Sequence, residues 1–184
     1  MKIAISGKMC SGKSFITNLL IKHFEKENKH FKKLSFADDV YKIARELFNM
    51  KTKNRELLQS IGTKMREIDP DIWAKSTTQR SQNHKFVIID DLRFPNELHY
   101  LKLNNFIIIR LNISKEEQIK RLKETYPDTY HQHIKNLNHQ SETSLDTVSN
   151  DKFDIIFNIN NNTNSEIIFK EIIQFLKQKK LFNS

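Results

Sequence analysis

Two of the three glycines in the chain lie five positions apart, in the segment Gly7-Lys8-Met9-Cys10-Ser11-Gly12-Lys13-Ser14. An apolar run at residues 3–5 precedes this segment and a helical apolar pattern follows it, so it connects a buried strand to a helix. The glycines allow the backbone amides of such a loop to point at phosphate oxygens, and the helix adds the positive end of its dipole. Lys13 would reach the β and γ phosphates, and Ser14 would ligate magnesium. The whole segment therefore predicts a P-loop that binds ATP with Mg²⁺.

Two carboxylates, Asp90 and Asp91, end the most continuous apolar run of the chain, at residues 86–89. A carboxylate at the end of a buried strand can hold the magnesium shell or orient a nucleophile, and we assign that role to Asp91. The next turn adds Arg93 and Glu97, which places an acid, a cation and another acid between one strand and one helix. On charge patterning alone, a structural ion pair with a helix N-terminal carboxylate is the competing interpretation.

The elements that position these residues follow from the apolar pattern. Five strands are predicted at about residues 3–5, 31–36, 86–91, 106–111 and 153–159. Helices are predicted after the P-loop to about residue 28, in several pieces between 38 and 82, from Pro95, from a capping box at Ser114, and from Thr163. Alternating strands and helices indicate an α/β three-layer sandwich of the P-loop NTPase type, whose five-stranded parallel sheet binds ligands outside the carboxyl ends of its strands.

Composition excludes several other classes of protein. The 184 residues suit a single domain over residues 1–184, and the mean hydropathy is −0.62. No apolar run approaches the roughly 20 residues of a bilayer span, and Gly7 comes too early for a signal peptide, so we expect a cytoplasmic protein with no membrane partner. The single cysteine, Cys10, excludes an internal disulfide framework and a cysteine-based zinc cluster.

The formal net charge of +9 indicates anionic partners, either nucleotides or nucleic acid. Nucleic-acid binding is therefore an alternative function. The lysines are spread over predicted solvent faces without a recognition motif, so we expect no stable nucleic-acid binding. An Asn-Lys-x-Asp sequence is absent, which argues against a GTPase switch.

Several segments together give a more specific interpretation. These are Asp91-Leu92-Arg93-Phe94-Pro95-Asn96-Glu97, the upstream Arg55-Glu56-Leu57-Leu58-Gln59-Ser60-Ile61-Gly62 with Arg66 and Trp73, and His139-Gln140-Ser141-Glu142. In order and spacing, over roughly residues 1–145, they resemble the bacteriophage-type deoxynucleoside monophosphate kinases. The resemblance implies an adenylate-kinase-like fold, with acceptor-binding helices at about 38–82 and a lid at about 125–145. It also implies transfer of the ATP γ-phosphate to a deoxynucleoside 5′-monophosphate.

The resemblance also assigns roles to individual residues. The acid-x-Arg-x-x-x-Glu set of the family falls on Asp91, Arg93 and Glu97, and a lid cation near Arg121 would join Arg93 in stabilising the transferring phosphoryl group. The expected acceptor site holds Asp38 for the sugar, Lys42 and Arg66 for the phosphate, Gln59 and Trp73 for the base, and Ser141 and Glu142 at its border. Core packing of Trp73, and solvated helix faces for Lys42 and Arg66, are the competing interpretations.

Further alternatives remain open from the sequence. A P-loop kinase could act on another small phosphorylated acceptor, such as dephospho-coenzyme A or an isoprenoid precursor. Homodimers are common among the resembling enzymes, so a homodimer is an open expectation. The phage-like motifs suggest a viral protein that works in the host cytoplasm.

Overall fold

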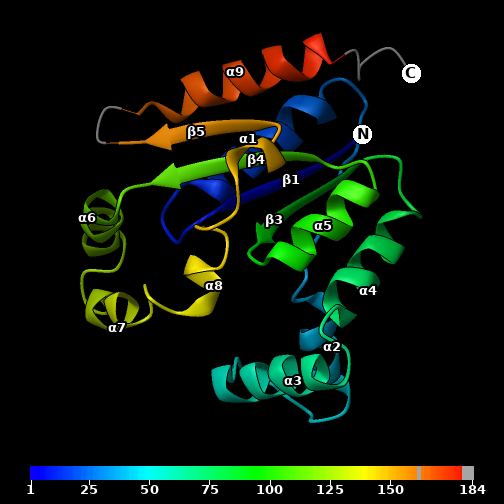
Figure 1. Cartoon of the computed structure of the whole chain (residues 1–184), viewed down its shortest axis with the longest axis vertical. Coiled ribbons are helices and arrows are strands. Elements are labelled where there is room, and N and C mark those ends of the chain that lie inside the picture. Colours follow the sequence, from blue (N-terminus) through cyan, green and yellow to red (C-terminus); the bar gives the residue numbers. More distant parts are fainter. Residues whose placement is uncertain (161–162, 180–184) are drawn as a thin grey trace.

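A single sheet of five parallel strands forms the centre of the molecule, in the order β2-β3-β1-β4-β5 (Figure 1). The computed structural model describes residues 1–160 and 163–179. The strands are β1 (Lys2–Gly7), β2 (Lys32–Leu34), β3 (Val87–Leu92), β4 (Ile107–Ile113) and β5 (Ile155–Ile159). The predicted parallel sheet is confirmed, and β1, which leads into the P-loop, lies at its centre.

Helices cover both faces of the sheet and make the three layers. On one face, α1 (Lys13–Glu25) and α9 (Ser165–Gln178) bury side chains such as Leu20 and Ile172 against the isoleucines of β1 and β4. On the other face, α4 (Ile72–Ser81) and α5 (Pro95–Leu103) pack through Ala74 and Leu98. In Figure 1, α9 lies above the sheet and α1 runs behind its strands, while α4 and α5 lie below β1.

Capping explains where several helices begin. The Ser114 hydroxyl accepts a hydrogen bond from the N–H of Glu117 and starts α6 (Lys115–Thr125), as the capping box predicted. Pro95 is the first residue of α5, where its missing N–H costs nothing. Pro70, by contrast, precedes α4 without starting it, because Asp71 is the N-cap. The second strand is shorter than predicted, and α1 ends at Glu25.

A third apolar cluster lies away from the sheet. It joins α2 (Asp38–Glu46) to α3 (Arg55–Ile68), and both project at the bottom of Figure 1. Trp73 is at its centre with 3% of its surface exposed, among Val40, Ala44 and Ile61, and its indole N–H donates to the carbonyl oxygen of Gly62 at 3.2 Å. The predicted stacking of Trp73 on a base is therefore wrong in this structure, because its ring is enclosed by the core.

Two short helices occupy the polar insertion at residues 125–145. They are α7 (Tyr130–Lys135) and α8 (Gln140–Thr143), and the single-turn η1 (Asn150–Lys152) follows before β5. Within the described ranges, no helix has the length and apolar character needed to cross a membrane.

Candidate active site

The P-loop connects β1 to α1, as its sequence predicted. Glycine is required at position 7, because a Cβ atom there would lie 2.8 Å from the carbonyl oxygen of Leu111 on β4. Gly12 has a φ of 93°, in the left-handed region that glycine adopts without strain, and α1 begins at the next residue. The free N–H groups of the first turn of α1 therefore face the loop, where an anion is stabilised by the helix dipole.

Lys13 lies across the P-loop. Its Nζ donates to the carbonyl oxygens of Gly7 and Lys8 at 2.7 and 2.8 Å, and 9% of the residue is exposed. Burial, followed by the positive charge of Arg93, lowers the pKa of Lys13 to about 8. A bound phosphate would supply the counter-charge that this ammonium group lacks.

A cleft of about 420 Å³ opens beside this loop, and we call it the P-loop cleft. Ser14 is exposed at its wall, so its hydroxyl is accessible to a ligand. Other lining residues are Met9, Cys10, Gly12, Lys13 and Arg121.

Arg121 belongs to α6 and not to the predicted lid. Its Nε donates to Glu117 at 2.6 Å, and its other nitrogens donate to the carbonyl oxygens of Cys10 at 3.4 Å and Asn160 at 3.3 Å. Arg121 therefore fastens α6 to the P-loop and to the end of β5. Arg121 thus lies outside the predicted lid but lines the P-loop cleft, and its role toward the transferring phosphoryl group stays a prediction.

The two carboxylates at the end of β3 have separate environments. Ala4 pairs with Ile89 but Ser6 pairs with Leu92, so β3 contains one extra residue at this point. Asp91 is half-buried and accepts hydrogen bonds from the hydroxyl of Ser35 and from the N–H groups of Phe36 and Ala37. Burial raises the pKa of Asp91, and the three accepted bonds oppose that shift.

Asp90, unlike Asp91, has an electrostatic effect on Lys13 of the P-loop. Its charge acts to raise the pKa of Lys13, against the effect of burial, and it pairs with Lys33 Nζ at 2.6 Å. The alternation of side chains along β3 could have indicated that Asp90 is the carboxylate on the P-loop side. Ile88 packs on the face of the sheet that α1 covers, and residue 90, two positions later, belongs to the same face. The sequence analysis assigned the metal to Asp91, which the structure does not bring to the cleft that holds Ser14.

Magnesium fits this site only as an ion with few protein ligands. Among the described residues, no group of three or more His, Cys, Asp or Glu side chains is placed to hold a metal. Mg²⁺ in nucleotide sites is commonly held by one or two protein oxygens together with phosphate and water oxygens. The exposed hydroxyl of Ser14 is such an oxygen, so the residues present fit the ion.

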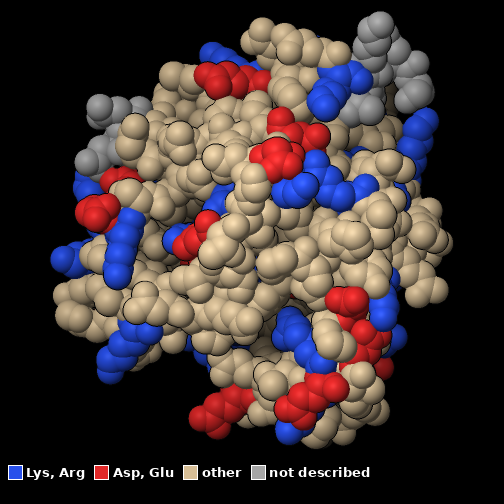
Figure 2. Space-filling view, in the orientation of Figure 1, with Lys and Arg blue, Asp and Glu red and all other residues tan. Residues whose placement is uncertain are grey.

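A second cleft, of about 490 Å³, is lined by Arg93 and by residues of α3, and we call it the α3 cleft. It is visible in Figure 2 as a hollow between α3 at the bottom and the body of the molecule. Of the residues predicted to bind an acceptor, it brings together Gln59, Arg66, Arg93 and Ser141, with Asp91 and Glu97. Asp38, Lys42 and Glu142 do not line it.

Asp38 and Lys42 lie at the turn between β2 and α2 and on α2, outside the α3 cleft. Asp38 accepts from the N–H of Ser35 at 2.9 Å and pairs with Arg80 at 3.0 Å, while Lys42 is exposed on α2. Arg80 also donates to the carbonyl oxygen of Ser35 at 3.1 Å. Asp91 also bonds to this turn, at Ser35, Phe36 and Ala37. Arg80 and Asp91 together therefore fix the turn, which forms one wall of the α3 cleft. Sequence reasoning missed Arg80, because no local pattern links α4 to this turn.

The floor of the α3 cleft carries a cation and a neutral acid. The Arg66 guanidinium donates to the carbonyl oxygen of Gly62 at 3.2 Å and lies 5.0 Å from the ring centre of Phe94. Glu97 is 3% exposed and accepts from the N–H groups of Arg93 and Phe94 at 2.8 and 3.0 Å. Burial raises the pKa of Glu97 to about 8, and the charge of Asp91 adds to this.

The model of the family AAA_18, described as an AAA domain, matches residues 3–143. The chain belongs to this family. No curated protein matches it in sequence.

Solved structures show that this AAA domain has the three-layer fold of P-loop kinases. Shikimate kinase from Aquifex aeolicus vf5 superposes with a TM-score of 0.59 at 18% identity, covering 98% of this chain and 99% of that one. Shikimate kinase from Acinetobacter baumannii in complex with shikimate gives 0.59 at 14%, covering 98% and 94%. An uncharacterized protein from Eubacterium ventriosum ATCC 27560 gives 0.62 at 15%, covering 97% and 98%.

Contacts of Arg93 and Glu142 link the two clefts of the AAA domain. Arg93 lines the α3 cleft and also donates to the carboxylate of Glu142 and to the carbonyl oxygen of Ser141 at 3.1 Å. Glu142 in turn accepts from the N–H of Met9 in the P-loop at 2.7 Å. A cation is thus held between a phosphate-binding loop and a separate ligand-sized cleft.

Proposed function

We propose that this protein is a P-loop kinase that transfers the γ-phosphate of ATP to a deoxynucleoside 5′-monophosphate. The observation that carries the proposal is the pair of clefts, one beside the P-loop and one beside α3, which are linked by the contacts from Arg93 to Glu142 and from Glu142 to Met9. Phosphoryl transfer requires a donor and an acceptor in line, with positive charge between them. The P-loop supports ATP as donor, and the motif resemblance supports the nucleotide as acceptor.

In this proposal the charged residues around the two clefts have separate roles in phosphoryl transfer. The P-loop amides and Lys13 would neutralise the donor phosphates, and Arg93 would stabilise charge on the transferring group. Magnesium, when bound with ATP, would supply further charge neutralisation, and Ser14 would hold it. On the acceptor side, Arg66 offers two N–H groups to a phosphate, a geometry that suits its planar fork.

The lining of the α3 cleft favours an acceptor with a flat apolar part. Phe36, Val40, Tyr41 and Leu58 provide apolar surface, and Gln59 provides an amide that can donate and accept hydrogen bonds. A nucleobase presents a flat ring with polar edges and suits such a wall. Because burial raises the pKa of Glu97 to about 8, most of it is protonated at neutral pH and it repels an acceptor phosphate less than an ordinary glutamate would.

Other roles follow as expectations. Positive and negative side chains are interspersed on the face shown in Figure 2, and no continuous band of Lys and Arg crosses that face. We therefore propose nucleotides, and not nucleic acid, as the anionic partners. A gel-shift titration at physiological salt should show no complex with DNA or RNA, and tight binding with a steep salt dependence would favour the alternative.

The test is an assay of ADP release with ATP, magnesium and one acceptor at a time. The acceptors are dAMP, dCMP, dGMP, dTMP, the ribonucleotides, dephospho-coenzyme A and shikimate. Turnover with at least one deoxynucleotide is expected, with a loss of about 10² or more in Lys13→Ala. Lys22→Ala is the matched control, because Lys22 is exposed on the same helix. Turnover only with dephospho-coenzyme A or shikimate would move the proposal to that acceptor.

A further inference from the structure

Glu142 occupies an enclosed position where four parts of the chain meet. Its side chain is 5% exposed and lies among the P-loop, α6, α8 and the turn between β3 and α5. One carboxylate oxygen accepts from the N–H of Met9 at 2.7 Å and from the amide of Gln118 at 3.4 Å. The other accepts from Arg93. The carboxylate thus uses both oxygens, one on each side.

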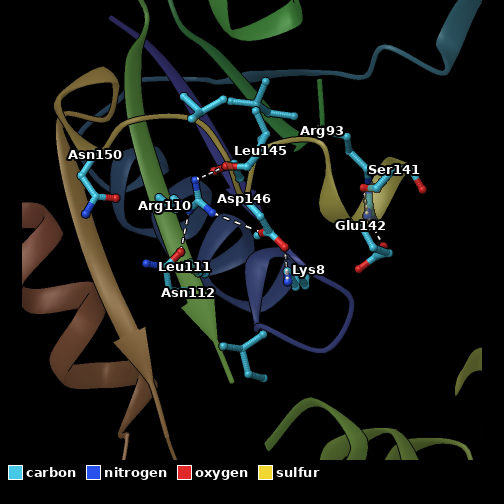
Figure 3. Close-up of a pocket in the computed structure, with 15 residues that line it drawn as sticks. Lys8, Arg93, Arg110, Leu111, Asn112, Ser141, Glu142, Leu145, Asp146 and Asn150 are labelled. Atoms are coloured by element: carbon cyan, nitrogen blue, oxygen red, sulfur yellow. Dashed lines mark hydrogen bonds and ion pairs between the residues drawn. The ribbon is translucent and has the colours of Figure 1, made fainter. Parts of the chain in front are cut away.

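These contacts connect the two clefts through a single side chain. Met9 lines the P-loop cleft and Arg93 lines the α3 cleft, and Glu142 bonds to both. Gln118 strengthens the P-loop end, because its amide also donates to the carbonyl oxygen of Met9 at 3.1 Å. Figure 3 shows Arg93, Ser141 and Glu142 together at one end of a further cavity.

The segment that carries Glu142 is attached elsewhere by a separate ion pair. Asp146 pairs with Lys8 at 2.7 Å, and Arg110 donates to the carbonyl oxygen of Leu145 at 2.7 Å (Figure 3). This second attachment holds residues 145–146 to β4 and the P-loop without any help from Glu142. The carboxylate of Glu142 is therefore not needed merely to keep the segment in place.

A carboxylate is the group that this position requires. Arg93 retains conformational freedom in its long side chain unless a charged partner fixes it, and a charge-assisted hydrogen bond does so most strongly. The carboxamide of glutamine has one acceptor oxygen, so it could keep the bond from Met9 or the bond from Arg93 but not both.

We propose that Glu142 is a positioning residue that holds the guanidinium of Arg93 toward the P-loop, so that a correctly placed cation lies between the P-loop and the α3 cleft during phosphoryl transfer. The proposal rests on the proposed function. It replaces the expectation that Glu142 binds the acceptor, because Glu142 does not line the α3 cleft. Its effect is on the transfer step and passes through Arg93.

The experiment compares Glu142→Gln with Asp146→Asn, each measured for kcat and for both KM values with the best acceptor. We expect Glu142→Gln to lower kcat about ten- to a hundredfold, with both KM values within about threefold of wild type. Asp146→Asn removes the partly exposed partner of Lys8 and should change kcat less than about threefold. Equal losses in the two variants would show that only attachment of the segment matters and would overturn the proposal.

A double-mutant cycle tests whether Glu142 acts through Arg93. In an Arg93→Ala background, Glu142→Gln should cost less than about twofold in kcat, because the group that it positions is gone. A full additional loss would assign Glu142 a structural role instead. Glu142→Asp retains the charge and should recover part of the activity lost in Glu142→Gln, and circular dichroism verifies that each variant is folded. A wild-type protein without transferase activity would overturn the proposed function itself, which a wild-type-like Glu142→Gln would not.

Discussion

Glu97 provides the sharpest prediction, because an acid that is neutral at pH 7 has a measurable effect on stability. The perturbation is Glu97→Gln, which keeps the shape of the side chain and an oxygen for the N–H groups of Arg93 and Phe94 but cannot ionise. In the folded protein burial raises the pKa of Glu97 from 4.5 to about 8. Between these pH values the folded state binds a proton that the unfolded state has released.

The sign and size of the effect follow from that proton. Because the folded state binds more protons, the free energy of unfolding of the wild type falls as the pH rises, by about 1.4 kcal/mol per pH unit. From pH 5 to pH 8 the ceiling on the loss is about 4 kcal/mol. Below the unfolded pKa and above the folded pKa the contribution is constant. The glutamine variant lacks this term, so its stability relative to wild type should rise across the same range.

Urea unfolding of both proteins at pH 5, 6.5 and 8 measures the difference directly, since the other titrating groups cancel. A gain of about 2–4 kcal/mol for the variant relative to wild type, from pH 5 to pH 8, is expected. Parallel stability curves would refute the reasoning, because they would show that Glu97 has the same charge in the folded and unfolded states over this range.

Three further predictions concern the α3 cleft. Asp91→Asn should raise the acceptor KM about tenfold and leave the ATP KM within threefold in steady-state kinetics, because the turn after β2 loses its anchor; equal rises in both would contradict this. Trp73→Ala should lower the free energy of unfolding by about 3–5 kcal/mol in urea titrations, since a buried indole leaves a cavity; unchanged stability with a raised acceptor KM would favour base stacking. Arg66→Ala should raise the acceptor KM about tenfold, and Lys42→Ala should raise it less than twofold. The reverse order would indicate that Lys42, and not Arg66, binds the acceptor phosphate.

The parts of the account that the sequence predicted depend on short-range patterns. The P-loop is a contiguous motif between an apolar run and a helical pattern, so its residues come together without knowledge of the rest of the fold. The inner strands were recognisable for the same reason, because buried parallel strands are continuous apolar runs, whereas the edge strand β2 carries two exposed lysines. The resemblance compared segments by their order and spacing, and so it could group residues that are distant in the sequence. Four of the residues that it assigned to the acceptor site line one cleft in the structure: Gln59, Arg66, Arg93 and Ser141.

The parts that failed depend on long-range packing. Trp73 became a core residue because α2 and α3 fold back around it, which no local pattern indicates. Asp91 lines the α3 cleft and not the cleft that holds Ser14, and it lies where β3 contains an extra residue opposite β1. Asp38 does not line the α3 cleft because it pairs with Arg80, which is 42 positions away in the sequence and which no local pattern connects to it.

The central claim is that phosphate passes from the P-loop cleft to an acceptor in the α3 cleft. The most direct measurement is chromatographic quantification of both products after incubation with ATP, magnesium and a deoxynucleoside monophosphate. We expect deoxynucleoside diphosphate and ADP in equal amounts, with both lost in Lys13→Ala. ADP formed without any phosphorylated acceptor would show hydrolysis and not transfer, and would contradict the account.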